Sequence, residues 1–154
     1  MHPHAQLISD FYFAFQRRDA KAMAACYHPD LEFSDPVFVG LNHAEACAMW
    51  SMLCERGKDL QVTFTDVHAD DRTGRAHWDA RYTFSTTGRK VLNRIDAEFE
   101  FRDGKIVRHH DRFDFHAWSR QALGPMGLLL GWTPLVKNKV RSQARKSLDK
   151  YMRP

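Results

Sequence analysis

Hydrophobic and polar residues alternate with a period of two through much of the second half of the chain, from residue 59 to residue 115. Such alternation is typical of strands that bury one face. Turn sequences at 69–74, 85–88 and 102–104 divide the region into four strands, which we expect to form an antiparallel meander. The positions expected to face the interior are Leu60, Val62, Phe64, Ala76, Trp78, Ala80, Tyr82, Phe84, Val91, Asn93, Ile95, Ala97, Phe99, Phe101, Val107, His109, Asp111, Phe113 and Phe115.

The residues before this region favour helices, which flank one short alternating segment. Three helices are predicted from apolar spacing and from the polar residues that can cap them. The first begins near Pro3 or at the Ser9-Asp10 cap, the second spans 20–27 and the third spans 43–56. A strand is expected at 31–35, between the second and third helices. Helices followed by antiparallel strands indicate an α+β domain with helices packed on one face of a curved sheet.

Length and composition restrict the class of protein. A chain of 154 residues fits one domain with a sizeable core. It has no run of 18 or more apolar residues, and its N-terminus lacks the basic-then-apolar order of a signal peptide, so a cytoplasmic location is expected. The three cysteines, Cys26, Cys47 and Cys54, form no CxxC pair, which favours reduced thiols over a disulfide framework or a zinc site.

The positive charge is concentrated at the C-terminus. From residue 137 onward there are seven Lys or Arg residues and one Asp, a charge of +6, so the preceding residues carry −2 of the total of +4. This basic segment is predicted to be a helix that packs on its own domain, with an acidic partner or anionic lipid as alternatives. The apolar loop at 122–135 is too short to span a bilayer and could close a pocket, join a dimer or touch a membrane. Membrane contact is the less favoured alternative, and no nucleic-acid binding is expected, because the chain lacks an aromatic-interleaved basic groove.

The segment LEFSDPVF (31–38) places Asp35 on the same strand face as Leu31 and Phe33. A carboxylate on an apolar face is costly unless it is paired, hydrogen-bonded or protonated. Asp-Pro is also an ordinary opening for a turn. The segment by itself therefore leaves two interpretations, a turn at the end of the strand or a carboxylate with a function.

The order helix, helix, strand ending in Asp-Pro, helix and meander resembles the NTF2-like superfamily, which includes ketosteroid isomerase and SnoaL-type polyketide cyclases. The resemblance covers residues 5–118, and YHPDLEFSDPVFVG (27–40) is similar to the isomerase segment in which the aspartate before Pro-Val is the proton-shuttling base. It implies a cone-shaped, curved antiparallel sheet with the N-terminal helices on its concave face. It also implies a domain over 1–118, an extension over 119–154 packed on that domain, and Asp35 as the base.

Two features of the isomerase are not reproduced. Its oxyanion-donor tyrosine on the first helix matches Phe11 here, and Tyr12 lies one position away. Its second donor, a protonated aspartate, has Asp96 as the nearest counterpart, and alternation assigns Asp96 to the charged outer face. We therefore do not expect steroid isomerase activity itself, whereas related pocket chemistry remains open.

Alternation independently selects polar residues on faces that are otherwise apolar. We expect Asp35, His109 and Asp111 to be catalytic, because two inward carboxylates raise each other's pKa and a histidine could keep one of them ionised. The alternative is a buried polar pair that ties strands together, and His109 and Asp111 could each bridge to Asn93 instead. The residues expected to contact the substrate are Trp50, Trp78, Tyr82, Asn93 and Phe113.

These observations predict an enzyme that transfers a proton, in an isomerisation, cyclisation or dehydration, on an apolar carbonyl compound. The alternative is an NTF2-like domain that binds a hydrophobic ligand without catalysis, or that serves as a dimeric interaction module. No cofactor is needed for this chemistry, and no metal is expected, since HxxxH and HExxH spacings are absent. The charged outer face of the sheet could support a homodimer.

Overall fold

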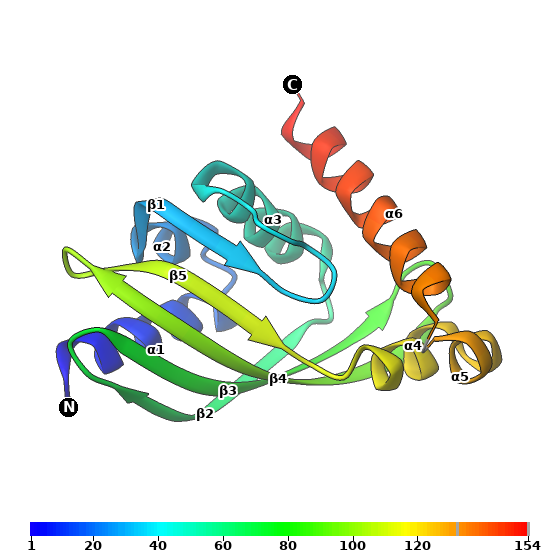
Figure 1. Cartoon of the computed structure of the whole chain (residues 1–154), viewed down its shortest axis with the longest axis horizontal. Coiled ribbons are helices and arrows are strands. Elements are labelled where there is room, and N and C mark those ends of the chain that lie inside the picture. The colour runs from blue at the N-terminus through cyan, green and yellow to red at the C-terminus, as the bar shows by residue number, and fades with distance from the viewer. Residues whose placement is uncertain (132, 154) are drawn as a thin grey trace.

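The computed structural model describes residues 1–131 and 133–153, and within them five strands form one curved, open sheet (Figure 1). The strands are β1 (Tyr27–Ser34), β2 (Gln61–Ala69), β3 (Thr73–Phe84), β4 (Arg89–Arg102) and β5 (Lys105–Arg112). Their order across the sheet is β1-β5-β4-β3-β2, and β2 to β5 form the predicted antiparallel meander. At one edge β1 pairs in parallel with β5, an arrangement that the sequence pattern did not indicate.

The described helices are α1 (Pro3–Gln16), α2 (Ala20–Ala25), α3 (His43–Arg56), α4 (Phe115–Leu123), α5 (Pro125–Leu130) and α6 (Pro134–Met152). Among the described residues, α1, α2 and α3 precede the meander, with β1 between α2 and α3, and α4, α5 and α6 follow it. In Figure 1, α1 crosses the sheet beside β2 and β3, while α4, α5 and the start of α6 lie at the opposite end from the N-terminus. The predicted α+β class, with N-terminal helices on a curved sheet and a C-terminal helix, is confirmed.

Local sequence explains where the N-terminal elements begin. The carboxylate of Asp19 accepts a hydrogen bond from the Ala22 amide and caps α2, and Asn42 caps α3 in a capping box. Helix α2 ends at Ala25, earlier than predicted, because β1 already begins at Tyr27. The strand passes through Pro29, which an edge strand tolerates because one side of its backbone has no ladder partner.

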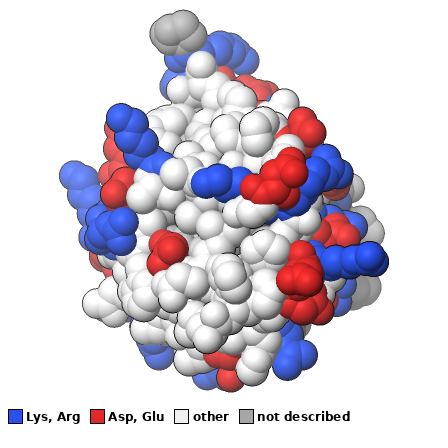
Figure 2. Space-filling view, turned by 90° about the vertical axis from the view of Figure 1, so that its left-hand side faces the viewer, with Lys and Arg blue, Asp and Glu red and all other residues white. Residues whose placement is uncertain are grey.

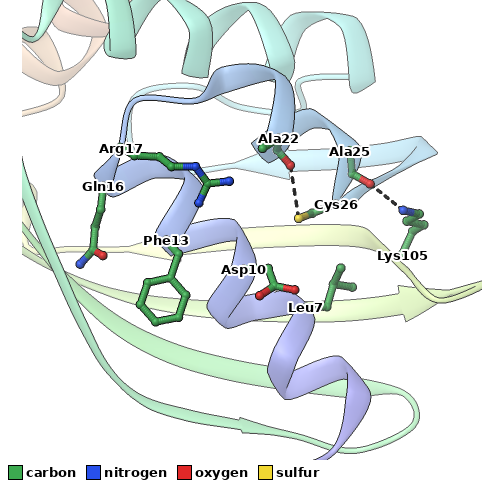
Figure 3. Close-up of a pocket in the computed structure, with 9 residues that line it drawn as sticks. All are labelled: Leu7, Asp10, Phe13, Gln16, Arg17, Ala22, Ala25, Cys26 and Lys105. Atoms are coloured by element: carbon green, nitrogen blue, oxygen red, sulfur yellow. Dashed lines mark hydrogen bonds between the residues drawn. The ribbon is translucent and has the colours of Figure 1, made fainter.

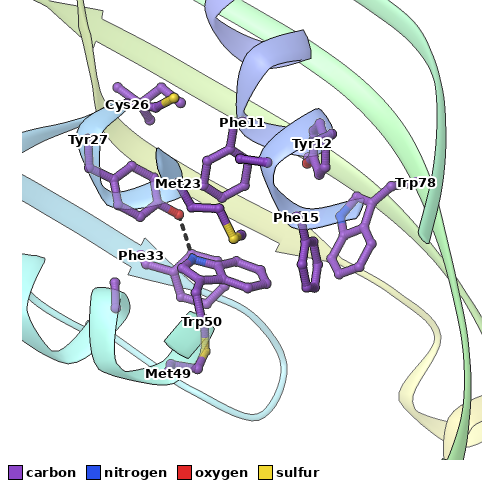
Figure 4. Close-up of a cluster of buried hydrophobic side chains, with 14 of the residues drawn as sticks. Phe11, Tyr12, Phe15, Met23, Cys26, Tyr27, Phe33, Met49, Trp50 and Trp78 are labelled. Atoms are coloured by element: carbon purple, nitrogen blue, oxygen red, sulfur yellow. Dashed lines mark hydrogen bonds between the residues drawn. The ribbon is translucent and has the colours of Figure 1, made fainter. Parts of the chain in front are cut away.

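The concave face of the sheet and the inner faces of the helices share an aromatic core. Figure 4 shows rings from α1 and α3 meeting the indole of Trp78 on β3. Trp50 contacts Phe11, Phe15 and Trp78 with ring centroids 5.6, 5.1 and 6.1 Å away. These aromatic pairs are separated by the distances at which edge-to-face contacts are favourable. The centre of the molecule is therefore filled by large rings.

The predicted alternation holds along β4 and at His109 and Asp111 on β5, but it fails at the start of β5. On β5, Ile106 is fully buried and Val107 is only partly buried, the reverse of the prediction. The register shifts between Glu100 and Phe101, so that Phe101 pairs with Ile106 and the inward side is offset by one residue. The extra residue, Val107, restores the predicted facing from Arg108 onward, so His109 and Asp111 point inward.

Strand β5 also ends earlier than the alternation predicted. Its last residue is Arg112, and Asp114 accepts a hydrogen bond from the Ala117 amide as the cap of α4. Phe113 therefore lies between the strand and the helix, and Phe115 is the first residue of α4. The predicted apolar loop at 122–135 instead contains the end of α4, all of α5 and the start of α6.

Residues after 118 pack on one another and on the rest of the chain. Helix α5 packs closely on α4, where a Cβ atom added to Gly127 would lie 1.9 Å from the carbonyl oxygen of Ser119. Helix α6 contacts α3 through the fully buried Leu148 and through an ion pair between Arg145 and Glu45. The predicted domain boundary at residue 118 falls inside α4.

Charged side chains cover the outer face of the sheet. Arg112 pairs with Glu98 at 3.1 Å, and Arg108 pairs with Glu100 at 3.5 Å. Asp96 also lies on this face, as alternation predicted, and bonds to His77. A homodimer through this face stays a prediction. Among the described residues, no helix is long and apolar enough to cross a membrane.

Replacement of Leu148 by Ala tests the docking of α6. Because the side chain is fully buried, the change should lower the free energy of unfolding by about 2–5 kcal/mol. Leu135→Ala on the same helix, at a side chain that is 75% exposed, should change it by less than about 0.5 kcal/mol. Urea denaturation of the two variants measures the difference, and equal effects would contradict the docked geometry.

Candidate active site

A chain of hydrogen bonds runs through the aromatic core. Trp50 Nε1 donates to the hydroxyl oxygen of Tyr27, which lies 2.8 Å from Nδ1 of His109. His109 Nε2 is in turn 2.9 Å from Oδ1 of Asp111. Because Tyr27 accepts from Trp50, all groups are satisfied when Tyr27 donates to Nδ1 and His109 carries its hydrogen on Nε2. We call Trp50, Tyr27, His109 and Asp111 the buried relay.

The buried relay is closed off from solvent. His109 has no exposed surface, and Asp111 is 2% exposed. The imidazole is surrounded by rings whose centroids lie 4.5 to 6.0 Å away, those of Phe11, Phe33, Trp50 and Phe99. The cavity that we expected around these inward residues is therefore filled at His109. Among the described residues, neither His109 nor Asp111 bonds to Asn93, and Asp111 instead accepts from Trp78 Nε1 at 3.4 Å.

Tyr12 is a second buried tyrosine near Asp111. Its ring stacks on Phe64, and within the described part of the chain its hydroxyl has no hydrogen-bond partner. Burial raises the pKa of Tyr12 well above its ordinary value, and the negative charge of Asp111 adds to the effect. This hydroxyl remains protonated and lies inside the core.

Asp35 forms the turn that one interpretation of the sequence predicted, and its functional role stays a prediction. Its Oδ1 accepts hydrogen bonds from the amides of Val37 at 2.7 Å and Phe38 at 2.6 Å, which makes it the first residue of a turn. Its side chain is also partly buried, and burial raises the pKa of this carboxyl from about 3.8 to about 7. The two backbone hydrogen bonds and Arg141 oppose this shift, whereas the charge of Asp111 adds to it.

Tyr82 lies close enough to Asp35 for the charge of that carboxylate to affect the pKa of its hydroxyl. The Tyr82 hydroxyl accepts a hydrogen bond of 2.7 Å from Trp118 Nε1 on α4, which leaves its own hydrogen for another acceptor. The pKa of Tyr82 is raised, mainly by burial and further by the charge of Asp35. A groove of about 510 Å³ opens at Tyr82 and is also lined by Val91 and Gln121. Asp35 does not line this groove, but it and Tyr82 are both partly exposed, whereas His109 and Asp111 are buried.

The residues predicted for the site divide into two groups. One group lies in the core and consists of His109, Asp111, Trp50 and Trp78. The other consists of the partly exposed Asp35 and Tyr82, where the charge of Asp35 raises the pKa of Tyr82. Asn93 is buried on β4, and Phe113 contacts both the main core and the smaller cluster formed with α4.

Sequence reasoning missed Tyr27 and Trp118. Tyr27 has the same parity as Leu31 and Phe33, so extending the alternation back past Pro29 would have found it. Trp118 lies three residues after Phe115 and four before Ala122, a helical spacing that the strand prediction obscured.

A second groove, of about 850 Å³, lies outside the cone between α1 and α2 (Figure 3). Charged side chains at its edges include Asp10, Arg17 and Lys105, and Lys105 donates to the carbonyl of Ala25. Burial raises the pKa of the Cys26 thiol to about 11, so this cysteine is not a reactive thiolate near neutral pH. Figure 2 shows the adjoining end of the molecule, where uncharged surface fills the middle of the view and charged side chains lie mostly around it. Among the described residues, no group of His, Cys, Asp or Glu could hold a metal ion.

The profile of the SnoaL-like domain matches residues 8–109 of the sequence. The chain belongs to this family. Its SnoaL-like domain contains the α1 to β5 core, most of the buried relay and Asp35. Among curated proteins, none matches the sequence.

Solved structures with the same fold come from several bacteria. A proposed polyketide cyclase from Xanthomonas campestris pv. campestris is 20% identical, with a TM-score of 0.65 over 77% of this chain and 96% of that chain. An LEH-like epoxide hydrolase of M. tuberculosis is 20% identical, with a TM-score of 0.65 over 87% and 95%. IdmH from Streptomyces antibioticus, another proposed polyketide cyclase, is 20% identical, with a TM-score of 0.65 over 79% and 98%. These similarities establish the NTF2-like fold.

The two buried tyrosines provide a matched test of the relay in this SnoaL-like protein. Tyr27→Phe removes the hydroxyl that joins Trp50 to His109, and the groups left unpaired should lower the free energy of unfolding by about 1–3 kcal/mol. Tyr12→Phe removes a hydroxyl without a described partner and should be neutral or stabilising. Denaturant unfolding of both variants measures this, and a larger loss for Tyr12→Phe would refute the relay.

The raised pKa of Asp35 predicts a pH dependence of stability. The folded state binds this proton more tightly than the unfolded state, so Asp35 should lower the free energy of unfolding as pH rises from about 4 to about 7. The loss is at most about 4 kcal/mol, from a shift of about three pKa units. Asp35→Asn keeps an oxygen that accepts from Val37 and Phe38 but does not titrate. The free energy of unfolding of the variant, measured relative to the wild type, should therefore rise across this pH window and stay constant above it. Parallel pH profiles in urea denaturation would contradict the shift.

Proposed function

We propose that the protein is an enzyme that transfers a proton on an apolar carbonyl compound, with Asp35 as the base. The observation that carries the proposal is a partly buried carboxyl that two backbone amides hold in place and whose pKa burial raises to about 7. A base of this pKa is suited to abstracting a proton near neutral pH. Membership of the SnoaL-like family and the fold shared with proposed polyketide cyclases support the same class of reaction.

The two oxygens of Asp35 have different tasks in this proposal. Oδ1 is held by the amides of Val37 and Phe38, which fixes the carboxylate. Oδ2 takes a proton from the carbon next to the substrate carbonyl. The carbonyl oxygen then becomes negatively charged and accepts a hydrogen bond from the Tyr82 hydroxyl, which Trp118 orients. Asp35 returns the proton to another carbon, which completes an isomerisation. In a cyclisation, the enolate carbon instead bonds to a second carbonyl carbon, and Asp35 gives its proton to the alkoxide oxygen that forms.

The buried relay has a supporting role in the proposal. His109 and Asp111 have almost no exposed surface, so they act as positioning residues rather than as groups that touch the substrate. The charge of Asp111 helps to raise the pKa of Asp35. His109, which Tyr27 holds through Nδ1, bonds to Oδ1 of Asp111 and keeps this carboxylate in place.

The groove at Tyr82 favours a ligand with both apolar and polar parts. Val91 and the ring of Tyr82 provide apolar wall, while Arg81 and Lys90 line its outer part. Phenols and hydroxylated naphthoquinones carry an aromatic ring with polar oxygens at its edge. We therefore propose aromatic or polyketide-like carbonyl compounds as the substrate class.

Proton exchange provides a test that does not require the natural substrate. The wild type should accelerate the exchange of α-hydrogens of 2-tetralone with D₂O, followed by NMR, with a rate that rises with pH and levels off above about pH 7. Asp35→Asn and Tyr82→Phe should each lower this rate by about a hundredfold or more. Asp10→Asn, at an exposed carboxylate in the groove outside the cone, is the control and should keep the wild-type rate.

A thermal-shift screen separates catalysis from binding alone. Suppose that a phenol or naphthoquinone stabilises both the wild type and Asp35→Asn, and that neither protein accelerates exchange. That result would contradict the proposed enzyme and favour a domain that only binds a ligand. Exchange that is unchanged in Asp35→Asn would refute the assignment of the base.

A further inference from the structure

Large apolar side chains are exposed to solvent on α5 and on the first turn of α6. Met126 is 62% exposed, Leu128 is 52% exposed and Leu135 is 75% exposed. In Figure 1 these two segments lie at the same end of the molecule, away from the N-terminus. Single exposed apolar residues are ordinary, but several within ten residues of sequence indicate a surface that contacts something apolar.

The outward face of α6 carries a row of positive charges. At 100° per residue, Leu135 is aligned with Lys139, Lys146 and Lys150 within 60° around the helix axis. We call these three lysines the basic stripe. Val136, Val140, Ala144 and Leu148, which include the docked residues, fall on the opposite side of the helix. The helix therefore separates a side that packs on the protein from a side that faces outward.

The lysines of the basic stripe are not neutralised by the chain itself. All three are exposed, and within the described part of the protein none of them has a carboxylate at ion-pair distance. The neighbouring Arg145, in contrast, pairs with Glu45 and with Asp149. The charges of the basic stripe are thus available to a partner.

We propose that α5 and the outward face of α6 bind the surface of an anionic lipid bilayer. Exposed Met and Leu side chains insert at the boundary between headgroups and acyl chains, and a row of lysines binds the lipid phosphates beside them. A nucleic acid or an acidic peptide would use the charges but leave Met126, Leu128 and Leu135 in water. The buried Leu148 holds α6 on the domain, so the basic stripe meets the membrane as a preformed surface.

Co-sedimentation of the full chain with vesicles tests the proposal. The protein should bind vesicles of phosphatidylcholine mixed with phosphatidylglycerol, bind pure phosphatidylcholine much more weakly, and be released as salt is added. Lys139→Gln/Lys146→Gln/Lys150→Gln should weaken partitioning by about a hundredfold, because each lysine near an anionic surface contributes about fivefold. The matched control, Lys21→Gln/Lys58→Gln/Arg94→Gln, removes three exposed cations elsewhere and should bind like the wild type.

A second variant tests the apolar part of the surface. Leu128→Ser/Leu135→Ser changes exposed side chains, so it should keep the circular dichroism spectrum and melting temperature of the wild type, and it should partition at least about tenfold less. Failure of the wild type to bind anionic vesicles at low salt would overturn the proposal. Equal loss in the control triple variant would also overturn it. Tighter binding to duplex DNA than to vesicles, together with unchanged vesicle binding by the double serine variant, would assign the basic stripe to nucleic acid instead. None of these outcomes depends on the reaction proposed for Asp35.

Discussion

A carboxylate almost without exposed surface must be compensated inside the protein, and the compensation of Asp111 joins most of the fold. Its hydrogen bonds come from His109 on the same strand and from Trp78 on β3. His109 is then tied to Tyr27 on β1, and Tyr27 to Trp50 on α3. Three strands and one helix are thereby fixed relative to one buried charge. Because an unpaired partner in such an interior is costly, the relay favours one arrangement of these elements over others.

The same requirement separates the two acidic residues of the site. Asp111 is bonded to two side chains, and these side chains and the surrounding rings fill the space around it. Asp35 is held only through Oδ1, by backbone amides, at the edge of the core. Burial raises the pKa of this carboxyl to about 7, and the two amides and Arg141 offset only part of that effect. One carboxylate thus organises the interior, and the other is left in a state that suits proton transfer.

Sequence periodicity located the inward polar residues because β4 alternates around Asn93 and β5 alternates from Arg108 onward, which includes His109 and Asp111. It failed where the backbone departs from two residues per repeat. The register shift at Phe101 exchanges the predicted facing of Ile106 and Val107. Tyr27 was missed because Pro29 indicates a break before the strand, whereas the edge strand continues through it. Contacts between distant segments, such as that of Trp118 with Tyr82, depend on how α4 packs. No local pattern encodes them.

Helix α6 connects the two proposed surfaces physically. Arg141, on its inner side, donates to the carbonyl of Pro36, the residue after Asp35, and its charge lowers the pKa of that carboxyl. The basic stripe lies on the outer side of the same helix. A force that displaced α6 would remove Arg141 from Pro36 and so change the surroundings of the Asp35 carboxyl. Under the two proposals, lipid binding by a helix that stays docked through Leu148 would leave those surroundings unchanged.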